Sequence, residues 1–386
     1  MKLFIIPSWY PTKLHPESGT FFRDRAIILS KSDIEVVVIA HVLHSFKDVF
    51  HFNKIKVNQF QLDDNLPVYI NESINKYPRF PRYTFYQYKK NTLKLFNKAI
   101  KENGAPDLVF FNSSIWSSVA LFEDLKERNI PYIISEHLKE FMIPGSFTPF
   151  QKKIIANAYH SCSQIIATSS ALAKSISNNF PSCKEKLSII PNPVDENIFS
   201  LKSITNKKSF ITITCIALFR KEKRIDLVIE SFNNILKSGI KCKLKLIGDG
   251  PLKSYIHKKI KLNKMSDNIQ LLGYLSQDQI VKELHKSDLV VLASDIETFG
   301  VVLIEAQVCG VPVLATDCGG PRDIISSKTG VLTRPGSIDD FTRGMKNIIN
   351  KLDRYDAVSI RNRTIKYFGR NAYIEAIRNV IKKSLN

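Results

Sequence analysis

Acidic residues are scarce in this chain: 36 Asp and Glu stand against 56 Lys and Arg among 386 residues, which gives a net charge of +20. A balance this basic favours a polyanionic partner, and it fits nucleic acid, anionic lipid or a phosphorylated substrate equally well. Hydrophobic residues make up an ordinary 44% of the chain, which excludes a disordered or collagen-like protein. At about 150 residues per domain, the length predicts two or three domains.

Cysteines and long apolar runs are also sparse. The six cysteines include no Cys-x-x-Cys pair, so they predict reduced, buried thiols rather than a disulfide scaffold or a zinc site. No apolar run approaches the about 18 residues of a membrane span. The apolar stretch Leu3–Ile6 is too short for a secretory signal. We therefore expect a cytoplasmic protein.

Two ligand-binding motifs are missing. A nicotinamide dehydrogenase needs G-x-G-x-x-G after its first strand, but here Ile6 is followed by Pro7-Ser8-Trp9. No Asp-x-Asp occurs, and the nearest pattern is Asp295-Ile-Glu297. A transferase that holds Mg²⁺ or Mn²⁺ on a pyrophosphate needs such carboxylates, so we expect no metal and no other cofactor.

The chain does contain two series of short apolar runs separated by segments long enough for helices. This rhythm predicts an α/β fold in which two Rossmann-like domains face each other across a cleft. The expected parts are one Rossmann-like domain at 1–195, a second at 196–370 and a C-terminal helix at 371–386. A polar, linker-like stretch lies at 206–209. The expected strands are Leu3–Ile6, Glu35–Ala40, Asp107–Phe111, Tyr132–Ser135 and Gln164–Thr168, then Phe210–Ile216, Lys243–Ile247, Ile269–Leu272, Leu289–Ala293 and Val311–Thr316.

The most informative stretch follows the strand Leu289–Ala293. It places Glu297 in a loop, then Gly300, and then a helix that begins near Val301. The start of a helix offers backbone N–H groups and a positive dipole end, which suit a pyrophosphate. Glu305 lies on that helix, and its carboxylate can accept two hydrogen bonds from vicinal hydroxyls such as those of a ribose.

Glu297 and Glu305 form an E-x(7)-E pattern within ETFGVVLIEAQVCGVPVLAT, which resembles the family 4 retaining glycosyltransferases of the GT-B fold. The resemblance extends over most of the chain, because further segments match in the right order. Two of them depart from the family: Pro193 replaces a glycine, and Asp323 replaces a glutamate. The further segments are PSWYPTKLHPESGTFFRDRA, IISEHLKEF, IIPNPVDENIF, LKLIGDGP and GGPRDII.

The resemblance implies that the domain at 1–195 binds the acceptor and the domain at 196–370 binds the nucleotide sugar. It also implies a role for each matched residue. Glu305 would bind the donor ribose, Glu297 would face the donor sugar, and Lys223 would contact the donor phosphates. His137 would contact the donor sugar near C6 and act at the reacting face. The remaining residues implied in donor binding are Gly19, Arg220, Gly248, Gly250, Thr298, Phe299, Gly300 and Val301.

A lysine at position 223 has a physical reason, since the leaving nucleoside diphosphate develops negative charge that must be stabilised. The family's arginine five positions before this lysine is Leu218 here. Arg220 is the nearest basic candidate for its place, although a shift of two residues need not point the side chain in the same direction.

The acceptor side is expected in the first half. From Lys76 to Lys101 the chain carries basic residues, no acidic residue, and several aromatic residues between them. This mixture favours an anionic membrane surface, and the alternatives are a helix whose aromatics are core or a surface that stacks single-stranded nucleic acid. Phe141–Ile155, with Lys152 and Lys153, would flank the acceptor entrance. A lipid-linked saccharide is therefore the expected acceptor, used by a peripheral protein on the inner face of the membrane.

The resulting prediction is a retaining, metal-independent glycosyltransferase that uses a nucleoside-diphosphate sugar. The rivals are a nucleotide-sugar epimerase or a phosphorylase of the same fold, and a non-enzymatic basic protein that binds nucleic acid. A phosphorylase would need a much longer chain, and a nucleic-acid binder would have no use for Glu297 and Glu305. The residues leave the base open among UDP, GDP and ADP.

Overall fold

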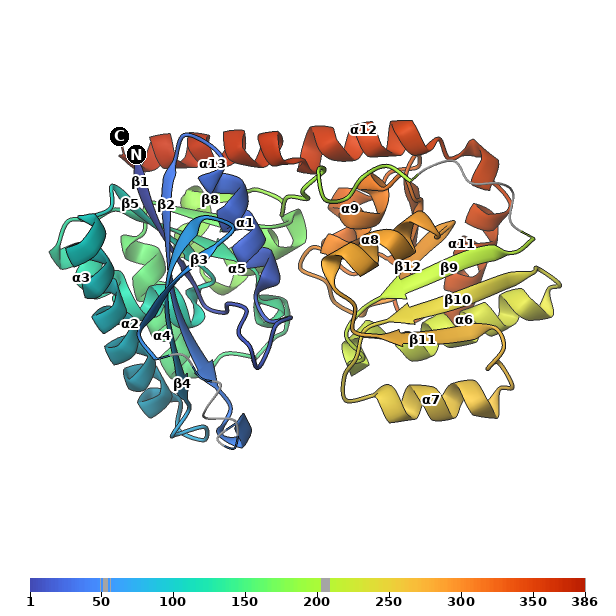
Figure 1. Ribbon diagram of the computed structural model, residues 1–386, viewed down its shortest axis with the longest axis horizontal. Coiled ribbons are helices and arrows are strands. Elements are labelled where there is room, and N and C mark those ends of the chain that lie inside the picture. The colour runs from blue at the N-terminus through green and yellow to red at the C-terminus, as the bar shows by residue number, and fades with distance from the viewer. Residues whose placement is uncertain (49, 51–54, 56, 203–208, 386) are drawn as a thin grey trace. The chain divides into compact units, whose positions relative to one another are not determined.

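The chain forms two compact units, each built on its own sheet (Figure 1). The computed structural model describes residues 1–48, 50, 55, 57–202 and 209–385. Of the polar stretch at 206–209, only Ser209 is among the described residues. The first unit comprises Met1–Thr168, Leu172–Ile190 and Tyr373–Asn386, and the second comprises Ser169–Ala171 and Pro191–Ala372.

The first unit holds an eight-stranded sheet in the order β3-β4-β2-β1-β5-β6-β7-β8. Neighbouring strands are parallel, except that the edge strand β3 pairs antiparallel with β4. The strands are β1 (Lys2–Pro7), β2 (Glu35–His44), β3 (Gln59–Asp63), β4 (Leu66–Ile74), β5 (Leu108–Asn112), β6 (Tyr132–Glu136), β7 (Gln164–Ala167) and β8 (Leu187–Ile189).

Helices cover both faces of this sheet, because the apolar strands present side chains alternately to each side. Phe4 and Ile6 of β1 join the core beneath α2, α3, α4 and α5, whereas Leu3 and Ile5 join the core beneath α1 and α13. The helices of this unit are α1 (Thr20–Ser30), α2 (Pro81–Asn103), α3 (Val119–Glu127), α4 (Pro149–Ser161), α5 (Ser170–Asn179) and the terminal α13 (Arg370–Leu385).

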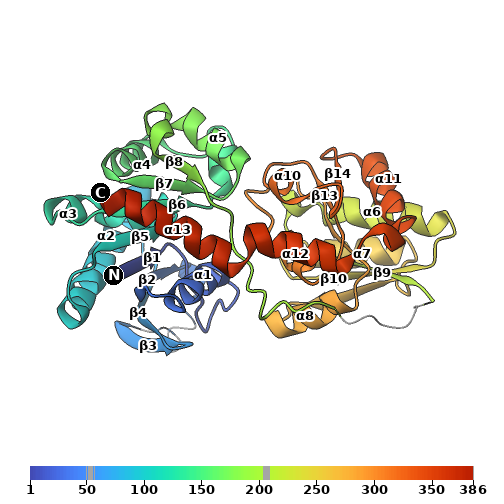
Figure 2. The same ribbon diagram turned by 90° about the horizontal axis from the view of Figure 1, so that it is seen from above.

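The terminal helix α13 belongs to the first unit from Tyr373 onward, although it follows the second unit in the chain. Its apolar face, which includes Tyr373, Ile377 and Ile381, is buried against the same core as Leu3 and Ile5. Figure 2 shows α13 running across this unit beside its strands.

The second unit holds a six-stranded, all-parallel sheet in the order β11-β10-β9-β12-β13-β14. Numbered from its own first strand, this is the order 3-2-1-4-5-6 of a doubly wound dinucleotide-binding fold. The strands are β9 (Ile211–Ile216), β10 (Cys242–Ile247), β11 (Ile269–Gly273), β12 (Leu289–Leu292), β13 (Val313–Thr316) and β14 (Gly330–Thr333).

Two buried clusters lie on the two faces of this second sheet. One packs α6, α7 and α11 beneath residues such as Ile213, and the other packs α8, α9 and α12 beneath residues such as Val290. The helices are α6 (Ile225–Lys237), α7 (Lys253–Leu262), α8 (Gln277–His285), α9 (Val301–Val308), α10 (Pro321–Ile324), α11 (Ile338–Ile349) and α12 (Ala357–Phe368).

The expected fold class is confirmed, since each half of the chain forms a Rossmann-like α/β unit. A strand forms at each of the ten expected places, but β3, β4, β8 and β14 were not expected. β4 carries polar residues such as Asn71 and Glu72 at buried positions, which hide its apolar pattern. All six cysteines are free thiols, five of them buried and Cys318 half-buried. Among the described residues, no helix is long and apolar enough to cross a bilayer.

Candidate functional site

Glu297 lies in the loop after β12, at the carboxyl end of the second sheet, where open α/β sheets bind ligands. Its backbone is fixed on both sides. Its N–H donates to the carbonyl of Cys318 (3.3 Å), and its carbonyl accepts from the N–H of Gly320 (2.8 Å). A β-bridge with Gly319 ties this loop to the loop after β13. The backbone of Glu297 is therefore fixed by the loop after β13 as well as by its own loop after β12.

The side chain of Glu297 pairs directly with Lys223, 74 residues earlier in the chain. The hydroxyl of Ser294 also donates to Oε1 of Glu297 at 2.7 Å. The side chains of Lys223 and Glu297 are only 23% and 10% exposed, so water screens the pair weakly. The structure thus brings together two of the three residues that the sequence assigned to catalysis.

Helix α9 begins directly after this loop. Gly300 caps it with φ 101°, a left-handed conformation that favours glycine. Val301 and Glu305 are one turn apart and both half-buried, so they share the least covered face of the helix. Phe299 is buried in the core, so any contact that it makes with a donor would come from its backbone. Thr298 is half-buried.

Two glycines let the loop after β10 approach the loop that carries Lys223. A Cβ atom on Gly248 would lie 2.0 Å from the carbonyl oxygen of Ala217, and one on Gly250 would lie 2.8 Å from that of Phe219. Both glycines also have positive φ, at 136° and 153°. They therefore shape the base of the site through their missing side chains.

The same loop shows how Leu218 and Arg220 relate. Both side chains are exposed, while Phe219 between them is buried. The N–H of Arg220 donates to the carbonyl of Leu218 at 2.8 Å, so a tight turn holds the two residues close together. Arg220 is thus available on the side of the loop that Leu218 occupies.

His137 follows β6 in the first unit. Nε2 of His137 accepts from the guanidinium of Arg25 and lies 3.0 Å from the hydroxyl of Ser135. Burial, and then the positive charge of Arg25, hold the pKa of His137 well below its usual range. The ring is therefore neutral, and because Nε2 accepts, the proton sits on Nδ1, which can donate to a ligand oxygen.

The start of α1 surrounds this imidazole. The rings of Phe21 and Phe22 lie 5.4 and 4.9 Å from that of His137. Gly19 caps α1 with φ 71°, and a Cβ atom there would lie 2.5 Å from the carbonyl oxygen of Trp9. The missing side chain of Gly19 therefore lets the long loop after β1 lie against the first turn of α1.

Sequence reasoning missed the residues that orient these groups. Arg25 is 3% exposed, and it donates from Nε to the hydroxyl of Tyr373 (2.7 Å) as well as to His137. Arg224 bridges Asp226 and Asp295 beside the Glu297 loop. Ser294 lies two residues after β12, and its place at the carboxyl end of a buried strand is a signal that could have been used. Arg25 lies within the matched segment PSWYPTKLHPESGTFFRDRA, but its residue type gives no role by itself.

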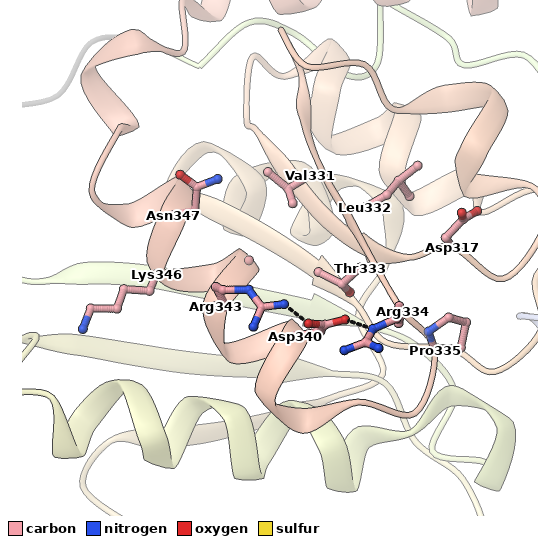
Figure 3. A pocket seen from close by; sticks show the side chains of 11 residues that line it. Asp317, Val331, Leu332, Thr333, Arg334, Pro335, Asp340, Arg343, Lys346 and Asn347 are labelled. Carbon is pink, nitrogen blue, oxygen red and sulfur yellow. Dashed lines mark hydrogen bonds and ion pairs between the residues drawn. The ribbon is translucent and has the colours of Figure 1, made fainter.

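A cavity of about 730 Å³ lies at the ends of β13 and β14 (Figure 3). Asp340 stands in its wall between Arg334 and Arg343 and pairs with both. None of the residues that the motifs assign to the donor lines this cavity, so we place the candidate donor site at Glu297 and Lys223. The cavity is lined by Asp317, Val331, Leu332, Thr333, Arg334, Pro335, Asp340, Arg343, Gly344, Lys346 and Asn347.

Solved structures with this fold are glycosyltransferases of the GT-B class. Sucrose-phosphate synthase from Thermosynechococcus elongatus superimposes with a TM-score of 0.80 at 14% identity, over 99% of both chains. Anabaena Alr3699/HepE in complex with UDP superimposes with a TM-score of 0.73 at 18% identity, over 99% of this chain and 100% of that one. At 14% and 18% identity, the structural similarity shows that this chain has the GT-B fold.

The family follows from sequence models that match both halves of the chain. Glycosyltransferase Family 4 matches residues 20–198, and Glycosyl transferases group 1 matches residues 197–366. The chain belongs to glycosyltransferase family 4, as its motifs indicated, and it is a glycosyltransferase.

Characterised relatives match parts of the chain. N-acetyl-alpha-D-glucosaminyl L-malate synthase of Bacillus anthracis is 28% identical over 269 residues, which are 66% of this chain and 69% of that protein. Poly(ribitol-phosphate) alpha-N-acetylglucosaminyltransferase of Staphylococcus aureus is 30% identical over 223 residues, 55% of this chain and 42% of that protein. The gpi3 subunit of phosphatidylinositol N-acetylglucosaminyltransferase of Schizosaccharomyces pombe is 28% identical over 165 residues, 43% of this chain and 36% of that protein.

Proposed function

We propose that this glycosyltransferase moves a sugar from a nucleoside-diphosphate sugar to an acceptor hydroxyl with retention of anomeric configuration. The observation that carries the proposal is the contact between Lys223 and Glu297 at the carboxyl end of the second sheet. A carboxylate for sugar hydroxyls and a cation for the departing diphosphate then act at one place. No carboxylate is assigned as a protein nucleophile. The acceptor oxygen bonds to the anomeric carbon as the bond from that carbon to the diphosphate breaks, and the departing phosphate takes the hydroxyl proton.

On this proposal, Lys223 and Arg220 neutralise the diphosphate together with the N-terminus of α9. Glu305, one turn into α9, accepts from the ribose hydroxyls. This set of charges serves the leaving group without a metal on the pyrophosphate. In the first unit, His137 donates through Nδ1 to an oxygen of the donor sugar.

The donor sugar that we propose is an N-acetylhexosamine carried on UDP. The names of all three relatives reported above include an N-acetylglucosaminyl group, which supports the sugar. Anabaena Alr3699/HepE was solved with UDP bound, which supports the base.

For the acceptor we propose a lipid-linked saccharide at an anionic membrane surface. Of the aromatics between Lys76 and Lys101, Phe85, Tyr88 and Phe96 are core, as the alternative interpretation had it. The other four are 44% to 63% exposed and surround the start of α2. With three exposed basic residues beside them, they form what we call the α2 tip: Lys76, Tyr77, Arg79, Phe80, Arg82, Tyr83 and Tyr86.

The α2 tip supports membrane contact better than the middle of the helix does. Lys89 already pairs with Glu123 at 2.6 Å, which leaves less of its charge for lipid. Exposed aromatic rings beside arginines suit the headgroup boundary of an anionic bilayer. The apolar residues Phe141, Phe147 and Ile155 of the expected acceptor segment lie in the core, whereas Lys152 and Lys153 are exposed.

Calorimetric titration with UDP, GDP, ADP and CMP tests the donor proposal. We expect selective binding of UDP that EDTA does not change and that Glu305→Ala weakens, because the ribose loses its acceptor. A product formed from UDP-N-acetylglucosamine with the α configuration, detected by NMR, supports retention. Failure of all four nucleotides to bind overturns the donor site, and inversion of configuration overturns the mechanism.

Sedimentation with vesicles of phosphatidylglycerol and phosphatidylcholine tests the membrane proposal separately. Replacing Tyr83 and Tyr86 by serine removes exposed rings only, so the fold should persist while vesicle binding falls. The matched control is Tyr255→Ser, which removes a ring that is 50% exposed on α7 of the second unit. If the double variant binds vesicles as well as the unaltered protein, the α2 tip is not the contact surface.

A further inference from the structure

Three side chains in the first unit bring metal-ligating atoms together. One ring nitrogen of His15, one of His44 and a carboxylate oxygen of Asp48 all lie within 4.8 Å of one another. His15 comes from the loop after β1, His44 ends β2, and Asp48 lies in the turn that follows. An imidazole pair with one carboxylate is a ligand set for zinc and similar divalent metals.

Local hydrogen bonds already hold two of these ligands. The N–H of His15 donates to the hydroxyl of Thr12 at 3.1 Å, and its carbonyl accepts from the N–H groups of Thr12 and Ser18. The carboxylate of Asp48 accepts from the N–H of Ser45 at 3.0 Å, and its Oδ2 lies 3.4 Å from Nε2 of His15. The backbone therefore presents both ligands before any ion arrives.

The third ligand is oriented from behind by a buried carboxylate. Nε2 of His44 donates to Oε2 of Glu72 at 2.7 Å, and the two side chains are 1% and 0% exposed. This bond leaves the lone pair of the neutral ring on Nδ1. A carboxylate that accepts from the second nitrogen of a histidine is the usual outer partner of a metal-bound imidazole. The other carboxylate oxygen of Glu72, Oε1, is buried and has no hydrogen-bond partner. The packing of β4 alone therefore gives no reason for a carboxylate at this position.

We propose that His15, His44 and Asp48 bind a divalent ion of the zinc class, with Glu72 as the residue that positions His44. The side chain of His15 is 42% exposed and that of Asp48 is 20% exposed, which leaves a side open for the ion to enter and for a water ligand. The ion would pin the loop that runs from Thr12 to Gly19 onto the end of β2.

Titration of Zn²⁺ alone into the metal-stripped full-length chain tests this site, with binding followed by calorimetry and by the visible spectrum of the Co²⁺ form. We expect one ion per chain. Glu72→Gln should weaken zinc binding by about 10- to 100-fold, as loss of an outer partner does elsewhere. His15→Gln and Asp48→Asn, which each remove a ligand, should weaken it further. The Co²⁺ spectrum should change in both variants.

The matched control is His160→Gln, because His160 is an exposed histidine on α4 outside the cluster. It should bind zinc as the unaltered protein does. Thermal unfolding without metal shows whether His15→Gln and Asp48→Asn remain folded, and both positions are exposed enough to tolerate the change. Unchanged zinc affinity in these two folded variants, or an equal loss in His160→Gln, overturns the site. Competition by Mg²⁺ at equal concentration overturns the metal class.

Discussion

Removing the charge of Glu297 should tighten the binding of a nucleoside diphosphate that carries no sugar. Lys223 is held by Glu297 in the free protein, so a diphosphate must compete with this carboxylate for the ammonium. In Glu297→Gln the ammonium is released, and one negative charge is removed from beside the anion. The expected sign is the opposite of that for an ordinary loss of a binding residue.

The magnitude follows from the environment of the pair. Two unit charges 4 Å apart interact by about 4 kcal/mol at an effective dielectric of 20. Lys223 is 23% exposed and Glu297 10% exposed, so the pair is neither fully buried nor free in water. Discounting for this screening, we take about 1 to 2 kcal/mol, which corresponds to about 5- to 30-fold tighter binding of UDP. Lys223→Met should weaken the same binding.

Calorimetric titration of UDP into the two variants measures this effect, and Asp295→Asn is the matched control. It makes the same change in net charge two residues away, but Asp295 is 41% exposed and pairs with Arg224 instead of Lys223. Its effect should be about threefold or less, since exposed pairs contribute little. If UDP bound both variants with the same gain in affinity, the change in net charge alone would explain the effect. Weaker binding in Glu297→Gln would refute the competition.

Three further predictions concern the scaffold around the site. Gly320→Ala should abolish transferase activity and lower the melting temperature, because its Cβ would lie 2.2 Å from the Cα of Phe299 in the Glu297 loop. The unfolding free energy should fall by up to about 3 kcal/mol as the pH drops from 6.5 to 4. Burial lowers the pKa of His41 to about 4 in the folded protein, whereas the unfolded chain takes up the same proton near pH 6.5. Urea titrations of His41→Gln should lack this loss. Arg25→Met should raise the pKa of His137, because it removes a positive charge beside the imidazole, and an NMR titration of the ring that matches the unaltered protein would contradict this.

The two-sheet architecture could be predicted from the sequence, because buried parallel strands need continuous apolar runs that are visible along the chain. The loop and helix from Glu297 to Glu305 were likewise readable, since strand end, glycine and helix start follow one another along the chain. The strand β4 was not predicted because it buries polar residues. One of them, Glu72, pairs with His44 on β2.

The tertiary structure alone decided which distant groups meet. Lys223 reaches Glu297 because β9 and β12 are neighbours in the sheet and Gly248 lets an adjacent loop pack onto Ala217. The aromatics around α2 look alike in sequence, yet helix geometry buries Tyr88 and exposes Tyr86. Arg25 on α1 meets His137 after β6, and His15 in the loop after β1 meets His44 at the end of β2, only once the sheet has formed. Such contacts depend on strand order and backbone approach, which no local pattern encodes.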